Sequence, residues 1–99
     1  MPPALTHDEF SQHVNTRFQV QIDDGTTIEM ELAEISELKV HPNQEEFAIV
    51  FRGPSNAFLQ QGIRSVTHEQ MGQFELFLVP IQQDTQGFYY EAVFNRVRE

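Results

Sequence analysis

The side chains best suited to chemistry in this sequence are four histidines, which could ligate a metal or move protons. They are His7, His13, His41 and His68. No two stand at a metal-ligand spacing, and where a zinc-protease motif starting at His68-Glu69 needs a second histidine, the chain has Gly72. His7 and His13 are six residues apart and would lie on different faces of a helix. The histidines therefore predict no metal site.

Nucleophile, phosphate and calcium motifs are also missing from the sequence. No serine stands in a nucleophile-elbow pattern, and no glycine-rich turn precedes Lys39, as a phosphate-binding loop requires. Residues 23–25 lack the other ligands of an EF-hand loop, and a chain without cysteine forms no thiolate. We therefore expect a non-catalytic protein with no metal and no cofactor. The alternative is an enzyme whose residues converge only in the fold.

Acidic side chains form an outward-facing ladder in the first half of the chain. They are Glu29, Glu31, Glu34 and Glu37. Carboxylate pairs can do acid–base chemistry, but these would need burial to shift their pKa values, and the pattern places them in solvent. A solvated face is one interpretation and a contact for a basic partner is the other. Glu29 and Glu31 are thus candidate partner contacts.

Three residues near the middle of the chain are further candidate contacts. Arg52 ends an apolar strand, where it could hold a carboxylate that fixes the next loop or could anchor a partner. Phe58 and Leu59 are apolar residues within that loop. Either they plug the end of a barrel, or they form an exposed patch for a protein partner.

The composition narrows the partners and the compartment. The net charge is −9, with 15 acidic against six basic residues, and this balance disfavours nucleic acids and anionic membranes as partners. No signal-peptide pattern or membrane-length apolar run is present. We expect one domain over residues 1–99, with 1–5 as a loose lead-in. The default location is the cytoplasm, and export as part of a released assembly is the alternative.

The elements that would position these residues begin with a helix. Thr6 and Glu9 fit a capping box, and Leu5 and Phe10 fit a hydrophobic staple. The sequence therefore predicts a short helix over Thr6–Asn15 that covers the core.

A β-hairpin is predicted next. Arg17–Asp23 and Thr26–Leu32 each alternate apolar and polar residues. A two-residue loop would place their apolar sets on opposite faces. A three-residue loop over 23–25, with its glycine in the left-handed conformation, places both sets on one face and sets Arg17 opposite Glu31.

The rest of the chain predicts more strands. After a weak continuation over 33–38 and a break at 41–43, they are Glu46–Arg52, Ile63–His68, Phe74–Ile81 and Phe88–Val97. Glu46–Arg52 and Phe74–Ile81 are apolar on both faces, which favours either a central position in the sheet or coverage on both sides. We predict a mainly β fold with about six antiparallel strands in a small barrel or two-layer sandwich, plus one N-terminal helix.

Several segments of the second half resemble a known family. They are FRGP (51–54), LQQGI (59–63), FELFLVPI (74–81) and YEAVFN (90–95). With the leading helix and the Asp-Asp-Gly hairpin, they resemble a family of small bacterial proteins known only as an uncharacterised domain. The resemblance supplies no catalytic residue. Because members are associated with genes for phage-tail-collar-like proteins, it implies an accessory part of a tail-like or fibre-like assembly.

Three functions therefore compete. The favoured one is a non-catalytic structural or protein-interaction module, whose partner is a tail-collar-like protein or a second copy of the chain. The second is a small-ligand-binding β-barrel with aromatic residues such as Phe47, Phe77, Tyr89 and Tyr90 around the ligand. The third is the enzyme of unknown type.

Overall fold

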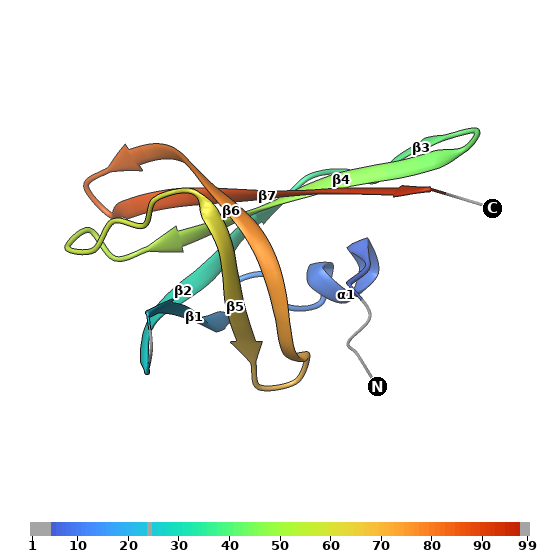
Figure 1. The fold of residues 1–99 in the computed structure, drawn as a ribbon. Helices are drawn as coiled ribbons and strands as arrows, with labels where there is room; N and C mark the ends of the chain where they lie inside the picture. The colour runs from blue at the N-terminus through green and yellow to red at the C-terminus, as the bar shows by residue number, and fades with distance from the viewer. Residues whose placement is uncertain (1–4, 24, 98–99) are drawn as a thin grey trace.

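The computed structural model describes residues 5–23 and 25–97 and is dominated by antiparallel strands (Figure 1). The elements are α1 (His7–Ser11), β1 (Arg17–Asp23), β2 (Thr26–Ile35), β3 (Lys39–His41), β4 (Gln44–Gly53), β5 (Gly62–His68), β6 (Gly72–Asp84) and β7 (Gly87–Val97). In these residues no helix has the length and apolar character that a membrane crossing requires.

The sheet closes on itself into a barrel. Its strand order is β2-β1-β5-β6-β7-β4-β3, and β2 also pairs with β4. Six strands therefore form a closed antiparallel ring, and β3 lies outside it, paired with β4. The predicted mainly β fold with one short N-terminal helix is confirmed. Strand β3 was not predicted: of residues 41–43, expected as a break, His41 ends β3 and 42–43 form the turn of a short hairpin.

The helix starts as predicted and ends earlier. The Thr6 hydroxyl accepts a hydrogen bond from the Glu9 backbone N–H at 3.1 Å and caps the helix. Instead of continuing to Asn15, the helix ends at Ser11. The chain then turns, with Asn15 at a φ of +71°, and the backbone of residues 15 and 16 forms hydrogen bonds with Leu32 of β2. This pairing with the sheet competes with further helical turns.

The β1–β2 hairpin confirms the predicted register over most of its length. Arg17 lies opposite Glu31, as expected. Near the turn the register shifts by one residue, and Asp23 pairs with Thr26. The predicted three-residue loop is wrong at its first position, because Asp23 belongs to β1; its second residue lies outside the described residues. Gly25 has a φ of +85°, the left-handed conformation expected of it.

Strand β6 is shared between two neighbours. Its first half, 72–78, pairs with β5, and its second half, 79–84, pairs with the start of β7. Beyond Glu91, β7 pairs with β4 alone among the described residues, and these two strands form an arm with β3 (Figure 1). Helix α1 lies against one face of this arm. Phe10 contacts Phe74 of β6 and Phe94 of β7, with ring centroids 5.9 and 5.3 Å away.

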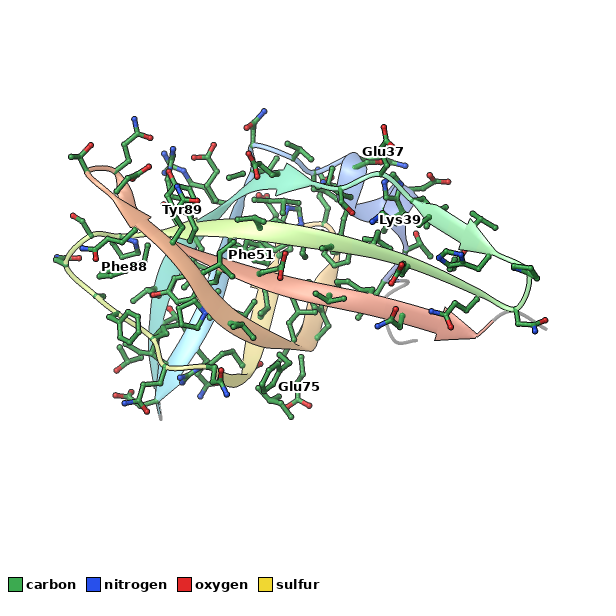
Figure 2. The ribbon with its side chains drawn as sticks, turned by 90° about the horizontal axis from the view of Figure 1, so that it is seen from above. Glu37, Lys39, Phe51, Glu75, Phe88 and Tyr89 are labelled. Atoms are coloured by element: carbon green, nitrogen blue, oxygen red, sulfur yellow. The ribbon has the colours of Figure 1, made fainter. Side chains whose placement is uncertain are left out.

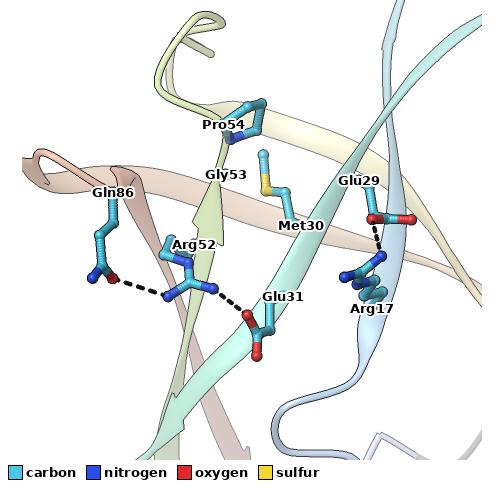
Figure 3. A pocket seen from close by; sticks show the side chains of 8 residues that line it. All are labelled: Arg17, Glu29, Met30, Glu31, Arg52, Gly53, Pro54 and Gln86. Carbon is cyan, nitrogen blue, oxygen red and sulfur yellow. Dashed lines mark hydrogen bonds and ion pairs between the residues drawn. The ribbon is translucent and has the colours of Figure 1, made fainter.

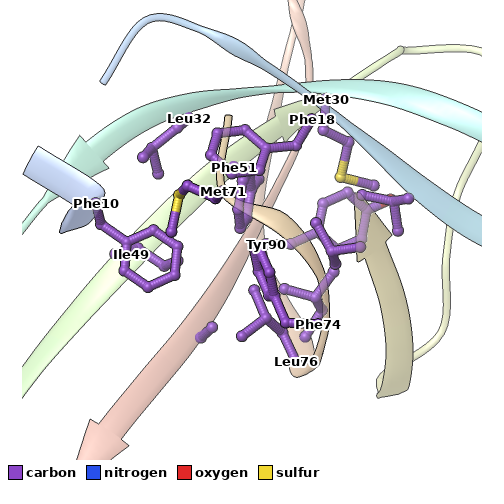
Figure 4. Close-up of a cluster of buried hydrophobic side chains, with 14 of the residues drawn as sticks. Phe10, Phe18, Met30, Leu32, Ile49, Phe51, Met71, Phe74, Leu76 and Tyr90 are labelled. Atoms are coloured by element: carbon purple, nitrogen blue, oxygen red, sulfur yellow. The ribbon is translucent and has the colours of Figure 1, made fainter. Parts of the chain in front are cut away.

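The barrel interior is filled by side chains (Figure 4). The largest fully buried residues are Tyr90, Phe10, Phe18, Phe51, Met30, Leu32, Ile49, Leu78, Val20 and Val66. The Tyr90 hydroxyl accepts a hydrogen bond from the Leu59 backbone N–H at 2.9 Å. Burial raises the pKa of Tyr90, so its phenol stays neutral in the core. The core therefore holds a polar group that has a partner.

The two strands that are apolar on both faces are central, as one interpretation expected, because each pairs with a strand on both edges. The other interpretation, coverage on both sides, is wrong. In a closed barrel only one face of each strand is inside. On β6, Leu76 and Leu78 point inward and are buried, whereas Phe77 is 52% exposed. On β4 the outward side chains of Ala48 and Val50 are only half-buried. The outer surface thus keeps apolar side chains that the fold does not need for its core.

Candidate functional site

One candidate region lies at the end of β4, where the barrel strands meet the following loop (Figure 3). Arg52 forms an ion pair with Glu31 of β2, and its guanidinium donates a second hydrogen bond to the Gln86 side chain at 3.2 Å. Arg17 pairs with Glu29 at 3.0 Å. These residues line an open cavity of about 190 Å³. We call this region the Arg52 network.

The Arg52 network continues to the β6–β7 turn. The Asp84 carboxylate accepts hydrogen bonds from the Gln86 backbone N–H at 2.8 Å and from the Tyr89 hydroxyl at 2.9 Å. These two bonds, the Gln86 one first, hold the pKa of Asp84 below its ordinary value of 3.8. The bond to Asp84 also raises the pKa of Tyr89. The turn is therefore held by charge-assisted hydrogen bonds.

The structure brings three of the predicted contact residues together and separates the other two from them. Glu29, Glu31 and Arg52 all line the Arg52 network, where each is paired with a neighbouring side chain. Phe58 is 55% exposed and packs against the Phe88 ring. Leu59 is only 6% exposed. Of the two interpretations given for Leu59, its burial agrees with the plug of the barrel and not with an exposed patch.

A buried histidine cluster, which the sequence did not reveal, lies beside the helix. His13 and His68 are both buried, and their ring centroids are 4.5 Å apart. His68 Nε2 lies 3.0 Å from the Thr16 hydroxyl, a distance that resembles a nucleophile–base pair. The chain offered no signal for it, because Thr16 and His68 are 52 residues apart in sequence.

The hydrogen bonds of His68 run in the direction opposite to the one that catalysis needs. Its Nδ1 accepts from the backbone N–H groups of Gln70 and Met71, at 3.0 and 3.2 Å. The proton must then sit on Nε2, which donates to Thr16, and the Thr16 hydroxyl donates to the His13 carbonyl at 2.6 Å. His68 cannot accept the Thr16 proton in this arrangement. Burial, then the neighbouring His13, lowers its pKa, which keeps the ring neutral.

A second region, missed by the sequence analysis, is a groove on the outer surface over β4. Three open cavities of about 300, 550 and 260 Å³ share lining residues and form one continuous depression. Its floor contains Ala48 and Val50 of β4 and Ala33, which bulges from β2. The view in Figure 2 looks down on this side of the arm, and Figure 1 shows α1 on the other side. We call it the β4 groove.

Two glutamates stand on the walls of the β4 groove. Glu34 of β2 and Glu91 of β7 both lie opposite Val50 in the strand pairing, one on each side. Among the described residues, neither carboxylate has an ion-pair or hydrogen-bond partner. The two chain segments come together only through the β2–β4 pairing that closes the barrel. No local pattern signals that pairing.

Comparison with known proteins identifies one family. The model of a family described as "Domain of unknown function (DUF6916)" matches residues 5–94. No curated protein and no solved structure matches the chain. No group of three or more His, Asp or Glu side chains within 5–23 and 25–97 could hold a metal ion.

Proposed function

This chain belongs to the DUF6916 family, which has no described activity, and we propose from the geometry that it is a non-catalytic structural or protein-interaction module. The outer surface of the barrel carries the proposal. Ile63 of β5 lies directly opposite Phe77 of β6, and both point away from the core. Ile63 is 68% exposed and Phe77 is 52% exposed. Adjacent large apolar side chains in solvent are typical of a protein contact.

The arm supports the same function. Residues 92–97 of β7 pair only with β4 among the described residues, so this length of backbone presents a free strand edge. Val93, on this stretch, is 58% exposed. A free edge can accept a strand from another protein through main-chain hydrogen bonds, and unprotected edges are otherwise an aggregation hazard.

The interior argues against the small-ligand alternative. Of the aromatic residues expected around a ligand, Phe47 and Tyr90 are buried among other core side chains, and Phe77 points outward. Gly53 packs so closely that an added Cβ would lie 3.1 Å from the Tyr90 ring. Small barrels of this kind are usually filled by their own side chains.

The family resemblance supports a finer proposal. The association with phage-tail-collar-like proteins favours an accessory component of a tail-like or fibre-like assembly, whose partner is a tail-collar-like protein or a second copy of this chain. The chain would be made in the cytoplasm and leave it only as part of a released assembly. Its acidic character, with a net charge of −9, favours a protein partner over nucleic acid or a membrane.

The proposal is tested by cross-linked affinity capture from the organism that encodes the chain. We expect the wild-type chain to retain a near-stoichiometric protein, identified by mass spectrometry. The double variant Ile63→Thr/Phe77→Thr should retain at least about fivefold less of it, because it removes two exposed apolar contacts. Val40→Thr, which changes an exposed residue of β3, is the matched control. A wild-type chain that retains no protein after cross-linking contradicts the proposal.

A further inference from the structure

We propose that the β4 groove binds an extended segment of a partner protein in which apolar residues alternate with lysine or arginine. This inference rests on the proposed interaction function and names the chemistry of the partner. The groove follows β4 from Glu46 to Arg52, about 20 Å of strand, which matches about six extended residues.

The shape of the groove favours an extended segment over a helix. Its floor is strand β4 together with Ala33 of the β2 bulge, and its walls are outward side chains of the neighbouring strands β2 and β7. Neighbouring strands lie about 4.8 Å apart, so the two walls are about 10 Å apart. An α-helix with its side chains is about 10–12 Å wide and would sit above this space.

The floor favours apolar side chains in the partner. Ala33, Ala48 and Val50 are small, half-buried residues that line it. Exposed apolar side chains continue it at both ends, with Val93 near one end and Ile81 near the other. Apolar residues of a bound segment would cover these side chains and remove both surfaces from water.

The walls favour basic side chains in the partner. Glu34 and Glu91 flank Val50 and, among the described residues, have no partner of their own. At the Tyr89 end, the charge of Arg52 is already compensated by Glu31. An acidic segment would meet repulsion at the centre of the groove. When the apolar side chains of an extended segment face the floor, the alternate residues point away from it, and the long side chains of lysine or arginine can bend back to the carboxylates of Glu34 and Glu91.

A second copy of the chain is a poor occupant for this groove. The chain has six lysine and arginine residues in total. Lys39 lines the groove itself, and Arg17 and Arg52 are in ion pairs. Arg64 donates to the backbone carbonyls of residues 22 and 60. These four side chains are therefore poor candidates for the groove of another copy, and two copies with a net charge of −9 each would repel one another. The chemistry points to a different, basic protein.

The test is an NMR titration of the ¹⁵N-labelled full chain with the synthetic peptide Ac-VKVKVKV-amide. We expect shift changes concentrated at the amides of Ser36, Ala48, Val50 and Glu91. The matched probes are Ac-VEVEVEV-amide, which reverses the charge, and Ac-SKSKSKS-amide, which removes the apolar side chains. Both should cause much smaller changes at these positions.

Variants tie the binding to the groove. Glu34→Gln/Glu91→Gln should weaken the VKVKVKV peptide about 5–10-fold, since two exposed ion pairs are lost. The charge-matched control Glu69→Gln/Glu75→Gln changes two exposed acids outside the groove and should leave the affinity within about twofold. Ala48→Gln, which fills the floor, should abolish the shifts, and each variant's own spectrum shows whether it is folded.

Other outcomes separate this inference from the proposed function. Equal binding of the VKVKVKV and VEVEVEV peptides, or shift changes away from the groove, overturns the inference. So does a captured partner that Ala48→Gln retains and Ile63→Thr/Phe77→Thr loses, and in that case the interaction function stands. If the wild-type chain captures no partner, the interaction function itself is contradicted.

Discussion

The Arg52 network and the β4 groove are two charged regions on the outer surface of one strand. In the network each charge has a partner: Arg52 contacts Glu31, and Arg17 contacts Glu29. In the groove, the carboxylates of Glu34 and Glu91 stand on either side of Val50 with no partner among the described residues. The same residue types thus fix the fold in one place and remain open to another molecule in the other.

The difference follows from where glycine and proline place the chain. At the network, Gly87 lets the start of β7 approach the Gly53 carbonyl of β4, and the chain then leaves the sheet at Pro54. Side chains from β2, β4 and the β6–β7 turn therefore converge. Over the groove the strands run on in regular pairing, and their outward side chains stand side by side. Side chains that converge form ion pairs within the chain. Side chains that stand side by side remain available for ion pairs with a partner protein.

The largest expected loss of stability comes from a substitution at Gly87, next to the Arg52 network. Gly87 has a φ of +150°, and a Cβ there would lie 2.0 Å from the Gly53 carbonyl oxygen. We expect Gly87→Ala to lower the free energy of unfolding by roughly 2–5 kcal/mol, from backbone strain and overpacking. Urea denaturation measures it. The control is Gly62→Ala, whose Cβ meets open space; an equal loss there would refute the explanation.

A smaller loss of stability is expected on removing Arg52, which is in an ion pair, and a smaller one still on removing Lys39, for which the described part of the chain shows no ion pair. Arg52→Met removes the ion pair and leaves Glu31 half-buried without its partner. We expect a loss of about 1 kcal/mol in the free energy of unfolding. Lys39→Met, at the groove, should cost less than about 0.5 kcal/mol. If the two losses measured by urea denaturation are equal, the distinction between the regions is unsound.

Mild acid tests whether buried His68, which lies outside both charged regions, determines how the free energy of unfolding depends on pH. Burial lowers the pKa of His68 in the folded chain below 6.5. As the pH falls, the unfolded chain therefore takes up this proton at a higher pH than the folded chain does. Stability should therefore be full above pH 6.5 and fall as the pH drops toward the folded pKa. His68→Asn should flatten this slope in urea denaturation from pH 7.5 to 5, whereas exposed His41→Asn should keep it. An unchanged slope in His68→Asn would mean that another group causes the loss of stability in mild acid.

The smallest expected effect is at the groove itself. Glu34→Gln/Glu91→Gln should change the free energy of unfolding by no more than about 0.5 kcal/mol, because neither carboxylate has a partner within residues 5–23 and 25–97. Thermal unfolding of this variant beside Arg52→Met makes the comparison direct. A loss as large as that of Arg52→Met would mean that the groove carboxylates serve the fold.

Much of the fold could be predicted because strand alternation has a period of two. Arg17–Asp23 was predicted with its bounds, and the face check on the hairpin gave the correct register along most of β1. Which side chains form ion pairs was harder to predict than which residues lie opposite one another. Arg17 lies opposite Glu31, yet its guanidinium pairs with Glu29, because a long side chain reaches diagonal neighbours as well.

The groove could not be predicted, since it depends on pairing between strands that do not follow one another. The β2–β4 pairing places Glu34 beside Val50, and a bulge at Ala33 sets which residues face outward. Strand β3 was missed because its three residues are exposed and give no apolar alternation. The exposure of Phe77 was missed because a two-sided apolar pattern does not distinguish a covered face from a contact face.

The contact between Phe10 and Phe94 also constrains how the chain folds. The two rings come from opposite ends of the described chain, and the long β4–β7 pairing joins segments that are far apart in sequence. Contacts between segments this far apart in sequence form slowly, because a large loop must close before they contribute any stability. During synthesis, α1 emerges before its partner strand exists. The contact that completes the burial of Phe10 against Phe94 cannot form until β7 has been made.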